Sequence, residues 1–415
     1  MERENPLKSI RIRSGMPLLA LVCGVIFLDS VGYGLVVPVL PLYAKQLGAS
    51  DFSIGFLFAT YAIALCLAAI PFGILSDRFG RKPFVLFGMF AMAGAFVFYA
   101  LAKSYPVLVV ARILDGLTAA ATWSAALALL GDRFPGREMG SKMGWAMSAA
   151  AIGGIAGPLL GGTLSDAFGY RAPFYVIAAA CVAGGCVSIF LEERKVARRA
   201  LSAGWRMLKP VFTNRNVMIA CLVTLVTTMG LGLLEPILPI YFKNTFDMTR
   251  TGIGIVFGMT MLFYAIASPL SGKLSDRVGR KRPILAGLLL TAAITPLIAV
   301  FKNVPAVFVL MAMFGFAIAF FGTPSIPLVT DALPQSPTIG EANQYGAAFG
   351  LINFFWSLGY ALGPLLGGAL YQWAGLLTAL LVYSGLLLVL IVVVALTLSD
   401  RSGGLETNEV VGGEE

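Results

Sequence analysis

The stretch GILSDRFGRKP at Gly73–Pro83 returns later in the chain as GKLSDRVGRKRP at Gly272–Pro283. The first nine or so positions of the two copies align at an offset of 199 residues. In both copies two glycines flank a cluster of charged residues, and long apolar runs lie on either side. The repeat indicates that the chain consists of two related halves.

Two further matches support a duplication. GGIAGPLLGG at Gly153–Gly162 recurs as GYALGPLLGG at Gly359–Gly368, at an offset of 206 residues. The Pro-x-x-Pro-x-Tyr pattern at Pro38–Tyr43 recurs at Pro236–Tyr241, at an offset of 198. Three matches in the same order, at a nearly constant offset, predict two equivalent halves. Such halves around a central site are the physical basis of alternating-access transport by rocking.

The composition of the whole chain places it in a membrane. Of its 415 residues, 58% are hydrophobic and 12% are charged, whereas a soluble domain carries about 25% charged residues. A soluble globule has nowhere to bury so much apolar surface, and disordered chains have the opposite composition. The composition therefore excludes both classes.

Twelve apolar runs are each long enough to cross a bilayer, and lipid leaves no water for open backbone groups, so each must be a helix. We therefore expect an all-α membrane protein of twelve transmembrane helices in two pseudo-symmetric six-helix bundles. The runs, numbered as spans 1 to 12, lie at about 16–43, 52–75, 83–102, 105–131, 141–163, 172–191, 214–242, 252–272, 283–301, 304–330, 343–369 and 375–398.

The basic residues set the expected orientation. The N-terminus, the loops after even-numbered spans and the tail hold 23 of the 30 Lys and Arg, and the other loops hold six. The positive-inside rule then places both termini in the cytoplasm. We expect an N-terminal bundle at 1–191, a cytoplasmic linker at 192–215, a C-terminal bundle at 216–400 and a cytoplasmic tail at 401–415.

Several classes of function are excluded by what the chain lacks. It contains no His, which excludes His-ligated metal sites and catalytic arrangements that need imidazole. A phosphate-binding loop is missing as well, so ATP coupling is not expected. We expect no enzyme activity, no cofactor and no metal. The basic residues lie in short clusters between apolar runs, which argues against a nucleic-acid partner, and we expect a monomer.

Four ionisable residues interrupt the apolar runs: Asp29, Arg112, Asp115 and Glu235. Burying a charge in a bilayer costs about 2.5–3.5 kcal/mol on insertion scales, so function is the default explanation. The cost falls when a carboxylate is protonated or paired with a cation. A carboxylate that alternates between a proton and a cationic substrate is the simplest antiporter. A structural hydrogen bond is the alternative for Asp29 and Glu235.

Arg112 and Asp115 lie three residues apart in span 4, so they can pair with each other. Two interpretations of Asp115 remain open. It either neutralises Arg112 or serves as an additional proton site, and we favour the first. Arg112, Asp115, Asp29 and Glu235 are therefore the candidate proton-coupling residues.

The repeated loop sequence resembles the best-known motif of the major facilitator superfamily, and the resemblance covers about residues 10–400. It implies a cytoplasmic charge cluster, formed by Asp77 with Arg78, Arg81 and Lys82, that latches one of two conformations. Gly73 is expected to let helices approach closely. The expected gating residues are Gly73, Asp77, Arg78, Gly80, Arg81, Gly272, Asp276 and Arg277.

The span-5 sequence is similar to the antiporter motif of that superfamily. Its residues are Gly153, Gly157, Pro158, Gly161 and Gly162. Small residues let helix backbones touch, and a proline kinks the helix. Generic close packing is the alternative interpretation, because the same pattern recurs in span 11.

Within the superfamily, the chain resembles drug:proton antiporters and vesicular monoamine transporters. Span 1 reads LDSVGYGLVVPVLPLY, and span 7 reads MGLGLLEPILPIYF. The family's amine- and proton-contacting acids fall on Asp29 and Glu235. Its R-x-x-x-G pattern, whose Arg is linked to proton coupling, falls on Arg112 and Gly116. Its other site aromatics fall on Tyr264, Trp356 and Tyr360.

The chain also departs from that family. The family's span-10 acid falls near Gly322, its span-11 acid near Asn353 and its span-2 lysine on Tyr61. The first loop outside the membrane, 44–51, is only a short turn. These differences put the proton stoichiometry in doubt, and they favour a microbial pump in the plasma (inner) membrane.

Tyr33 lies one turn after Asp29, and Thr228 shares a helix face with Glu235. On span 11, Asn353, Trp356 and Tyr360 follow i, i+3, i+7 spacing, so one face presents an amide and two aromatic rings. An aromatic cage with one or two carboxylates suits an organic ammonium ion, because a cation over a ring face gains about 0.5–2 kcal/mol. The candidate substrate-binding residues are Asp29, Ser30, Tyr33, Phe58, Tyr61, Thr228, Glu235, Tyr264, Asn353, Trp356 and Tyr360.

Together these observations predict a proton-coupled antiporter that exports cationic amphipathic or aromatic amines, including multidrug substrates and monoamines. Its expected partners are an organic cation, protons and the lipid bilayer. The alternative is a symporter or uniporter for a small metabolite or sugar, against which the span-1 acid and the span-5 motif argue.

Overall fold

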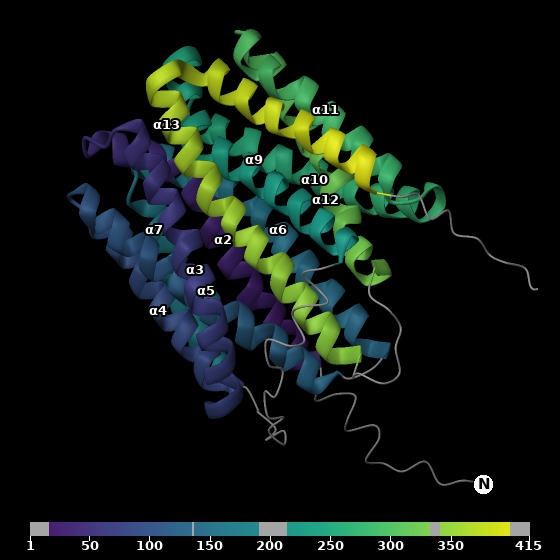
Figure 1. Ribbon diagram of the computed structural model, residues 1–415. Helices are drawn as coiled ribbons and strands as arrows, with labels where there is room; N and C mark the ends of the chain where they lie inside the picture. The colour runs from purple at the N-terminus through teal and green to yellow at the C-terminus, as the bar shows by residue number, and fades with distance from the viewer. Residues whose placement is uncertain (1–15, 135–136, 191–213, 333–340, 399–415) are drawn as a thin grey trace, which may run out of the picture.

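The computed structural model describes residues 16–134, 137–190, 214–332 and 341–398. Its first half contains six helices, and its second half contains the remaining five helical elements (Figure 1). The first six are α2 (Met16–Gln46), α3 (Asp51–Phe79), α4 (Arg81–Leu101), α5 (Tyr105–Arg133), α6 (Arg137–Phe168) and α7 (Ala172–Ser188). The others are α9 (Arg215–Phe246), α10 (Arg250–Val278), α11 (Lys281–Val300), α12 (Val304–Ala332) and α13 (Glu341–Thr397).

The last element, α13, consists of two helices. Gly375 has a φ of 79° and a ψ of 174°, a backbone conformation that glycine adopts at little cost. The chain turns there, between 341–374 and 376–397. Ten elements are long and apolar enough to cross a membrane, α7 is a shorter apolar helix, and dividing α13 gives twelve helices among the described residues. The prediction of twelve spans is confirmed.

Most of the expected linker, residues 192–213, and the expected tail at 401–415 lie outside the described residues. The expected domain boundaries therefore stay a prediction. Within the described ranges, α9 begins at Arg215, so the last residue of the expected linker already belongs to a helix.

Equivalent helices begin in the same way in both halves. The Ser50 hydroxyl caps α3 by accepting a hydrogen bond from the Ser53 N–H at 3.1 Å. The Thr249 hydroxyl caps α10 by accepting one from the Gly252 N–H at 3.0 Å. Such a cap satisfies a backbone donor that has no partner inside the helix. The duplication therefore extends to details that the sequence repeat alone does not mark.

The packing of the helices repeats as well. In the first half α2 packs on α6, and α3 packs on α5. In the second half α9 packs on α13, and α10 packs on α12. The halves meet where α3 contacts α13, where α6 contacts α10 and where α2 contacts α9. Figure 1 shows the purple and blue helices of the first half beside the teal to yellow helices of the second.

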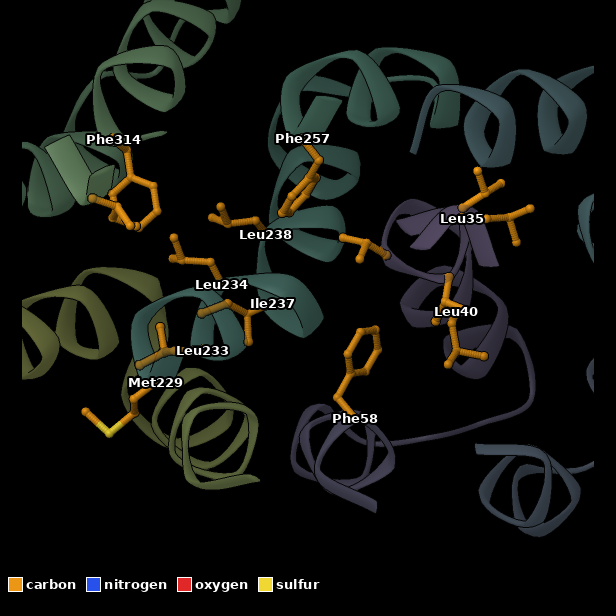
Figure 2. Close-up of a cluster of buried hydrophobic side chains, with 14 of the residues drawn as sticks. Leu35, Leu40, Phe58, Met229, Leu233, Leu234, Ile237, Leu238, Phe257 and Phe314 are labelled. Carbon is orange, nitrogen blue, oxygen red and sulfur yellow. The ribbon is translucent and has the colours of Figure 1, made fainter. Parts of the chain in front are cut away.

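An apolar layer fills part of the contact between the halves. Figure 2 shows Leu40 and Phe58 on α2 and α3, with Ile237 and Leu238 on α9 beside them. All four side chains are buried, with at most 2% of each exposed. These apolar side chains form no hydrogen bonds, so this layer does not fix the relative position of the two halves through directional bonds. Packing of this kind is compatible with a rocking motion.

One end of the bundle, which we call the short-turn end, carries the turns at 47–50, 102–104, 169–171, 247–249, 301–303 and Gly375. The opposite end is called the basic-loop end, because the Gly-Arg-Lys loops lie there. At the short-turn end the carboxylate of Asp166 accepts hydrogen bonds from the backbone N–H groups of Arg250 and Thr251, at 3.2 and 2.7 Å. Asp166 lies in the last turn of α6, and the two donors begin α10.

A matching contact lies at the equivalent place between α3 and α13. The side-chain oxygen of Gln372 accepts a hydrogen bond from the Phe52 N–H at 2.9 Å. Gln372 follows Asp166 by 206 residues, and Phe52 precedes Thr251 by 199, so both partners keep the offsets of the sequence repeats. These two cross-half contacts hold the halves together at the short-turn end.

Candidate functional site

The four charged residues that interrupt the apolar runs are buried between the helices. Asp29 on α2 is 6% exposed, Glu235 on α9 is 5% exposed, and Arg112 and Asp115 on α5 are 0% and 4% exposed. Each burial removes a charge from water, so the partner of each side chain decides what that side chain can do.

Arg112 and Asp115 form an ion pair within α5. Nη1 of Arg112 lies 3.0 Å from Oδ2 of Asp115. The Tyr99 hydroxyl of α4 donates to the same oxygen at 3.3 Å. The pair carries no net charge. This geometry fits the interpretation of Asp115 as the residue that neutralises Arg112.

Three aromatic rings surround the Arg112 guanidinium. Its carbon lies 5.2 Å from the ring centre of Tyr33, 5.0 Å from that of Phe58 and 4.4 Å from that of Tyr61. Nε and Nη2 have no hydrogen-bond partner among the described residues, and cation–π contacts replace those bonds. Phe58 and Tyr61, which the sequence suggests as substrate contacts, thus contact the protein's own cation.

Gly116 makes this arrangement possible. A Cβ atom at that position would collide with the backbone oxygen of Tyr61 and would lie 3.0 Å from the side chain of Ala64. The missing side chain lets α5 approach α3 closely. The glycine of the R-x-x-x-G pattern therefore brings Tyr61 over the arginine of the same pattern.

Asp29 is held by a residue that the sequence analysis does not identify. The indole Nε1 of Trp123 on α5 donates to Oδ2 of Asp29 at 2.5 Å. Trp123 follows Arg112 by 11 residues, about three helical turns, which places both on one face of α5. A buried indole N–H usually needs an acceptor. That requirement, together with the spacing, is the signal that could have found it.

Glu235 is held by a residue of the other half. The Tyr33 hydroxyl donates to Oε2 of Glu235 at 2.6 Å. Tyr33 lies on α2, one turn after Asp29, and Glu235 lies on α9. This hydrogen bond joins the two halves at the middle of the bundle.

Aromatic rings from both halves continue outward from Tyr33. Its ring centre lies 5.1 Å from that of Tyr61 and 6.1 Å from that of Tyr360, with the second pair edge to face. Tyr360 in turn lies 4.5 Å from Trp356. The structure therefore brings together the predicted residues Tyr33, Tyr360 and Trp356 beside Glu235.

Two other predicted residues lie around this row. Tyr264 on α10 faces Gly322 on α12, and its hydroxyl lies 3.9 Å from where a Cβ of Gly322 would sit. A Cβ at Gly322, the position near which the family's span-10 acid falls, would also lie 3.4 Å from Cγ2 of Thr227. Asn353 is exposed on α13.

Ser30 and Thr228 lie in helix contacts. A Cβ at Gly153 would sit 2.8 Å from the Cβ of Ser30, which places Ser30 against α6. The Thr228 hydroxyl donates to the Thr224 carbonyl of its own helix at 3.0 Å, and it also contacts Gly359 of α13. In this structure both residues serve the packing of neighbouring helices.

The span-5 motif also forms a helix contact. Its glycines lie against carbonyl oxygens of α2, where a Cβ would lie 2.7 Å from Phe27, 2.6 Å from Val31 and 2.5 Å from Leu35. The positions concerned are Gly153, Gly157 and Gly161. Gly359, Gly363 and Gly367 pack on α9 in the same way. The generic-packing interpretation describes this contact, and the assignment of antiport from the motif stays a prediction.

Gly162 is the exception within that motif, because it packs across the halves. A Cβ there would collide with the backbone of Arg250 at the start of α10. Arg250 also donates from Nη1 to the Ser165 carbonyl at 2.5 Å, and its guanidinium lies 3.8 Å from the ring centre of Tyr170. The last glycine of the motif thus belongs to the contact between the two halves at the short-turn end.

Matching charge clusters lie at the basic-loop end. Arg81 contacts Asp77 and lies 3.4 Å from Asp132. Arg280 lies 2.5 Å from Asp276 and 3.0 Å from Asp331. The sequence analysis does not identify Asp132 and Asp331, although they are separated by the same offset of 199 residues.

Gly73 makes no close contact with another helix in this structure. Outside its chain neighbours and its own helix backbone, no described atom lies within 4 Å of where its Cβ would sit, and the same holds for Gly272. The expectation that Gly73 lets helices approach closely stays a prediction. The close contacts between the halves lie instead at the short-turn end. Gly73 and Gly272 are near the other end, where α3 and α10 have no close neighbour at these positions.

The candidate site is defined by the two buried acids that lack a cationic partner among the described residues, in contrast to Asp115. Asp29 and Glu235 each accept a hydrogen bond from one neutral donor, and no Lys or Arg within the described ranges forms an ion pair with either. A carboxylate has about four acceptor positions. Both therefore keep unused acceptor positions that a proton or a cationic donor could take.

The family model of the Major Facilitator Superfamily matches residues 22–227 and again residues 220–413. The chain is similar to multidrug resistance protein 2 of Bacillus subtilis, with 28% identity over 365 residues that cover 84% of this chain and 87% of that protein. It is 26% identical to the human synaptic vesicular amine transporter over 81% of this chain and 64% of that protein.

The fold is similar to a solved structure of the same kind. A bacterial homologue of the human lysosomal transporter Spinster, in an inward-facing and occupied conformation, superposes with a TM-score of 0.78. The identity is 14%, and the match covers 95% of this chain and 97% of that one. At this identity the likeness concerns the fold alone.

Proposed function

Because this chain belongs to the Major Facilitator Superfamily, we propose that it is a proton-coupled antiporter that exports cationic amphipathic or aromatic amines by alternating access. The chain is a multi-pass membrane transporter and not an enzyme. The observation that carries the proposal is the state of Asp29 and Glu235. Both are buried, and among the described residues each accepts a hydrogen bond from a single neutral donor.

The physical argument rests on the cost of an unpaired buried charge. An ionised carboxylate without a cation is costly in a low-dielectric interior, and either a proton or an ammonium ion removes that cost. The two neutralise the same charge, so the binding of one disfavours the binding of the other. A proton that enters from outside then displaces the substrate cation outward, which is antiport.

The proposed orientation follows from the basic residues. With 23 of 30 Lys and Arg on one side, the positive-inside rule places the basic-loop end and both termini in the cytoplasm. We place the protein in the plasma (inner) membrane. The contacts of Asp166 and Gln372 would then hold the two bundles together at the outer end.

The moving bodies are the two bundles, at 1–191 and 216–400, and a single chain supplies both. The names of the relatives support the proposed substrates. One similar protein is named for multidrug resistance, and another is named for vesicular amine transport. Both names fit a site with two carboxylates and a row of aromatic rings.

Transport by inverted membrane vesicles tests this function. We expect export of a lipophilic cationic dye into the vesicles when a pH gradient is imposed, and none after the gradient is collapsed. Asp29→Asn and Glu235→Gln should each abolish uphill transport. The matched control is Asp247→Asn, because Asp247 is an acid whose side chain is 89% exposed at the short-turn end.

Two results would overturn the proposal. Uphill transport that survives collapse of the pH gradient would exclude proton coupling. Normal pumping by both carboxylate variants would exclude the mechanism. Dye movement along with the protons, rather than against them, would indicate symport.

A further inference from the structure

We propose that Trp123 is a positioning residue for Asp29, and that through it the site prefers amines with an N–H group over quaternary ammonium ions. The inference rests on the proposed function and narrows its substrate class. Its first observation is the juxtaposition of an indole N–H and a carboxylate oxygen at 2.5 Å, between α5 and α2.

The hydrogen bond divides the two oxygens of Asp29 into different roles. Oδ2 accepts the indole N–H, and none of the described residues donates to Oδ1. Asp29 retains 6% of its surface exposed. One oxygen is therefore anchored, while the other is left for a ligand that can donate a hydrogen bond.

The anchor belongs entirely to one half of the molecule. Both α2 and α5 lie in the first bundle, and they contact each other directly. Rigid-body rocking of one bundle against the other leaves the Trp123–Asp29 distance unchanged. The direction of Oδ1 is consequently the same when the site faces either side of the membrane.

The neighbouring aromatic cage is already filled. Tyr33, Phe58 and Tyr61 surround Arg112, so these ring faces are engaged by the protein's own cation. A substrate cation at Asp29 must therefore rely on the carboxylate itself. That requirement favours a cation that carries hydrogen-bond donors.

Ammonium ions that carry N–H groups meet this requirement, and quaternary ions do not. An N–H donated to a carboxylate forms a charge-assisted hydrogen bond, which is roughly twice as strong as a neutral one. A quaternary ion gains only Coulomb attraction from the carboxylate, because the ring faces of Tyr33, Phe58 and Tyr61 are engaged by Arg112. The anchored carboxylate thus discriminates between two ions of the same charge and similar shape.

Phenethylamine and its N,N,N-trimethyl derivative form a matched pair of probes. Their binding would be measured on the full-length protein in lipid nanodiscs by calorimetric titration. We expect wild type to bind the primary amine about tenfold more tightly, equivalent to one charge-assisted hydrogen bond. In Trp123→Phe the ring remains but the donor is lost, so primary-amine binding should fall about tenfold and quaternary binding less than twofold.

Two further variants complete the experiment. Trp123→Tyr restores a donor on an aromatic ring, and we expect it to recover part of the preference. Trp373→Phe is the matched control, because Trp373 is 80% exposed on α13. It should bind both probes as wild type does.

The outcomes separate this inference from the proposed function. Equal losses for both probes in Trp123→Phe, or no change, would overturn the positioning role and leave the amine substrate class standing. Wild-type protein that binds neither probe would overturn both. Should Trp123→Phe not fold, the wild-type ratio decides, and equal affinity for the two probes would refute the preference.

Discussion

Asp115 and Asp29 are buried in the same bundle to nearly the same degree, 4% and 6% exposed, but they are neutralised in different ways. Asp115 has a cation of its own, Arg112, at 3.0 Å. Among the described residues, Asp29 has the indole N–H of Trp123 and no cation. Burial alone therefore does not distinguish a transport carboxylate. We propose that the absence of a cationic partner within the described ranges does, and by that criterion Glu235 belongs with Asp29.

A second difference separates the two unpaired acids. Asp29 and its donor lie in one bundle, whereas Glu235 and its donor Tyr33 lie in different bundles. Rocking leaves the first hydrogen bond intact and must stretch or break the second. Asp29 is thus suited to bind the substrate in every state, and Glu235 is suited to link its own occupancy to the conformation.

The largest expected effect comes from removing the cation of the paired acid. Arg112→Met leaves Asp115 buried without its partner, and breaking a buried ion pair costs about 3–5 kcal/mol. Thermal unfolding of the purified protein should show a strongly lowered melting temperature. Adding Asp115→Asn should restore much of the stability, because no unpaired charge remains.

The same measurement on the unpaired acids should give the opposite sign. Asp29→Asn and Glu235→Gln each remove a carboxylate that lacks a cation, so the melting temperature should stay the same or rise. The proposed difference between paired and unpaired acids would be contradicted if Arg112→Met were as stable as wild type, or if Asp29→Asn unfolded as easily as Arg112→Met.

A smaller effect is expected at the hydrogen bond between the bundles. Tyr33→Phe removes a bond to a charged acceptor worth about 1.5–3 kcal/mol, so the state closed at the short-turn end should lose population by tenfold or more. Spin labels on Trp145→Cys and Leu270→Cys, both at exposed positions, would report the change in distance in a background without native cysteines.

Tyr43→Phe is the matched control for that experiment. The Tyr43 hydroxyl donates to the Ala102 carbonyl at 2.5 Å, within one bundle, so its removal should leave the distance distribution unchanged. If the distance distribution is also unchanged in Tyr33→Phe, the hydrogen bond between Tyr33 and Glu235 does not stabilise the state closed at the short-turn end.

The smallest effect is expected at an exposed ion pair. Lys243 lies 2.5 Å from Asp247 at the end of α9, with side chains that are 46% and 89% exposed. Lys243 lowers the pKa of Asp247 by a hydrogen bond and by its charge, so any stabilisation is present at neutral pH and is lost as the pH falls toward that pKa. Lys243→Gln should leave the melting temperature at pH 7 within error, because water screens the pair. A marked drop would show that exposure does not weaken ion pairs here.

The fold could be predicted almost completely from the sequence. Each apolar run forms a helix because lipid permits no alternative, and the repeated motifs predict two equivalent bundles. Gly375 marks the turn between spans 11 and 12, where one helical element becomes two. The sequence could not indicate at which end the bundles touch in this structure, and Gly73 lies away from that end.

Prediction of the site was less complete, for a physical reason. Asp29 and Glu235 stood out as acids within apolar runs. Periodicity shows which residues share a face of one helix, and it predicted the Arg112–Asp115 pair. It does not show how far each helix is rotated toward its neighbours. The Trp123–Asp29 bond and the rings around Arg112 depend on that rotation, so they emerged only from the three-dimensional arrangement.

Proton release on substrate binding tests the central claim most directly. The N,N,N-trimethyl derivative of phenethylamine carries a permanent charge, so any proton that appears in weakly buffered solution near neutral pH comes from the protein. We predict that wild type releases protons as it binds this cation, and that the double variant Asp29→Asn, Glu235→Gln releases none. Binding by wild type without proton release would contradict the account.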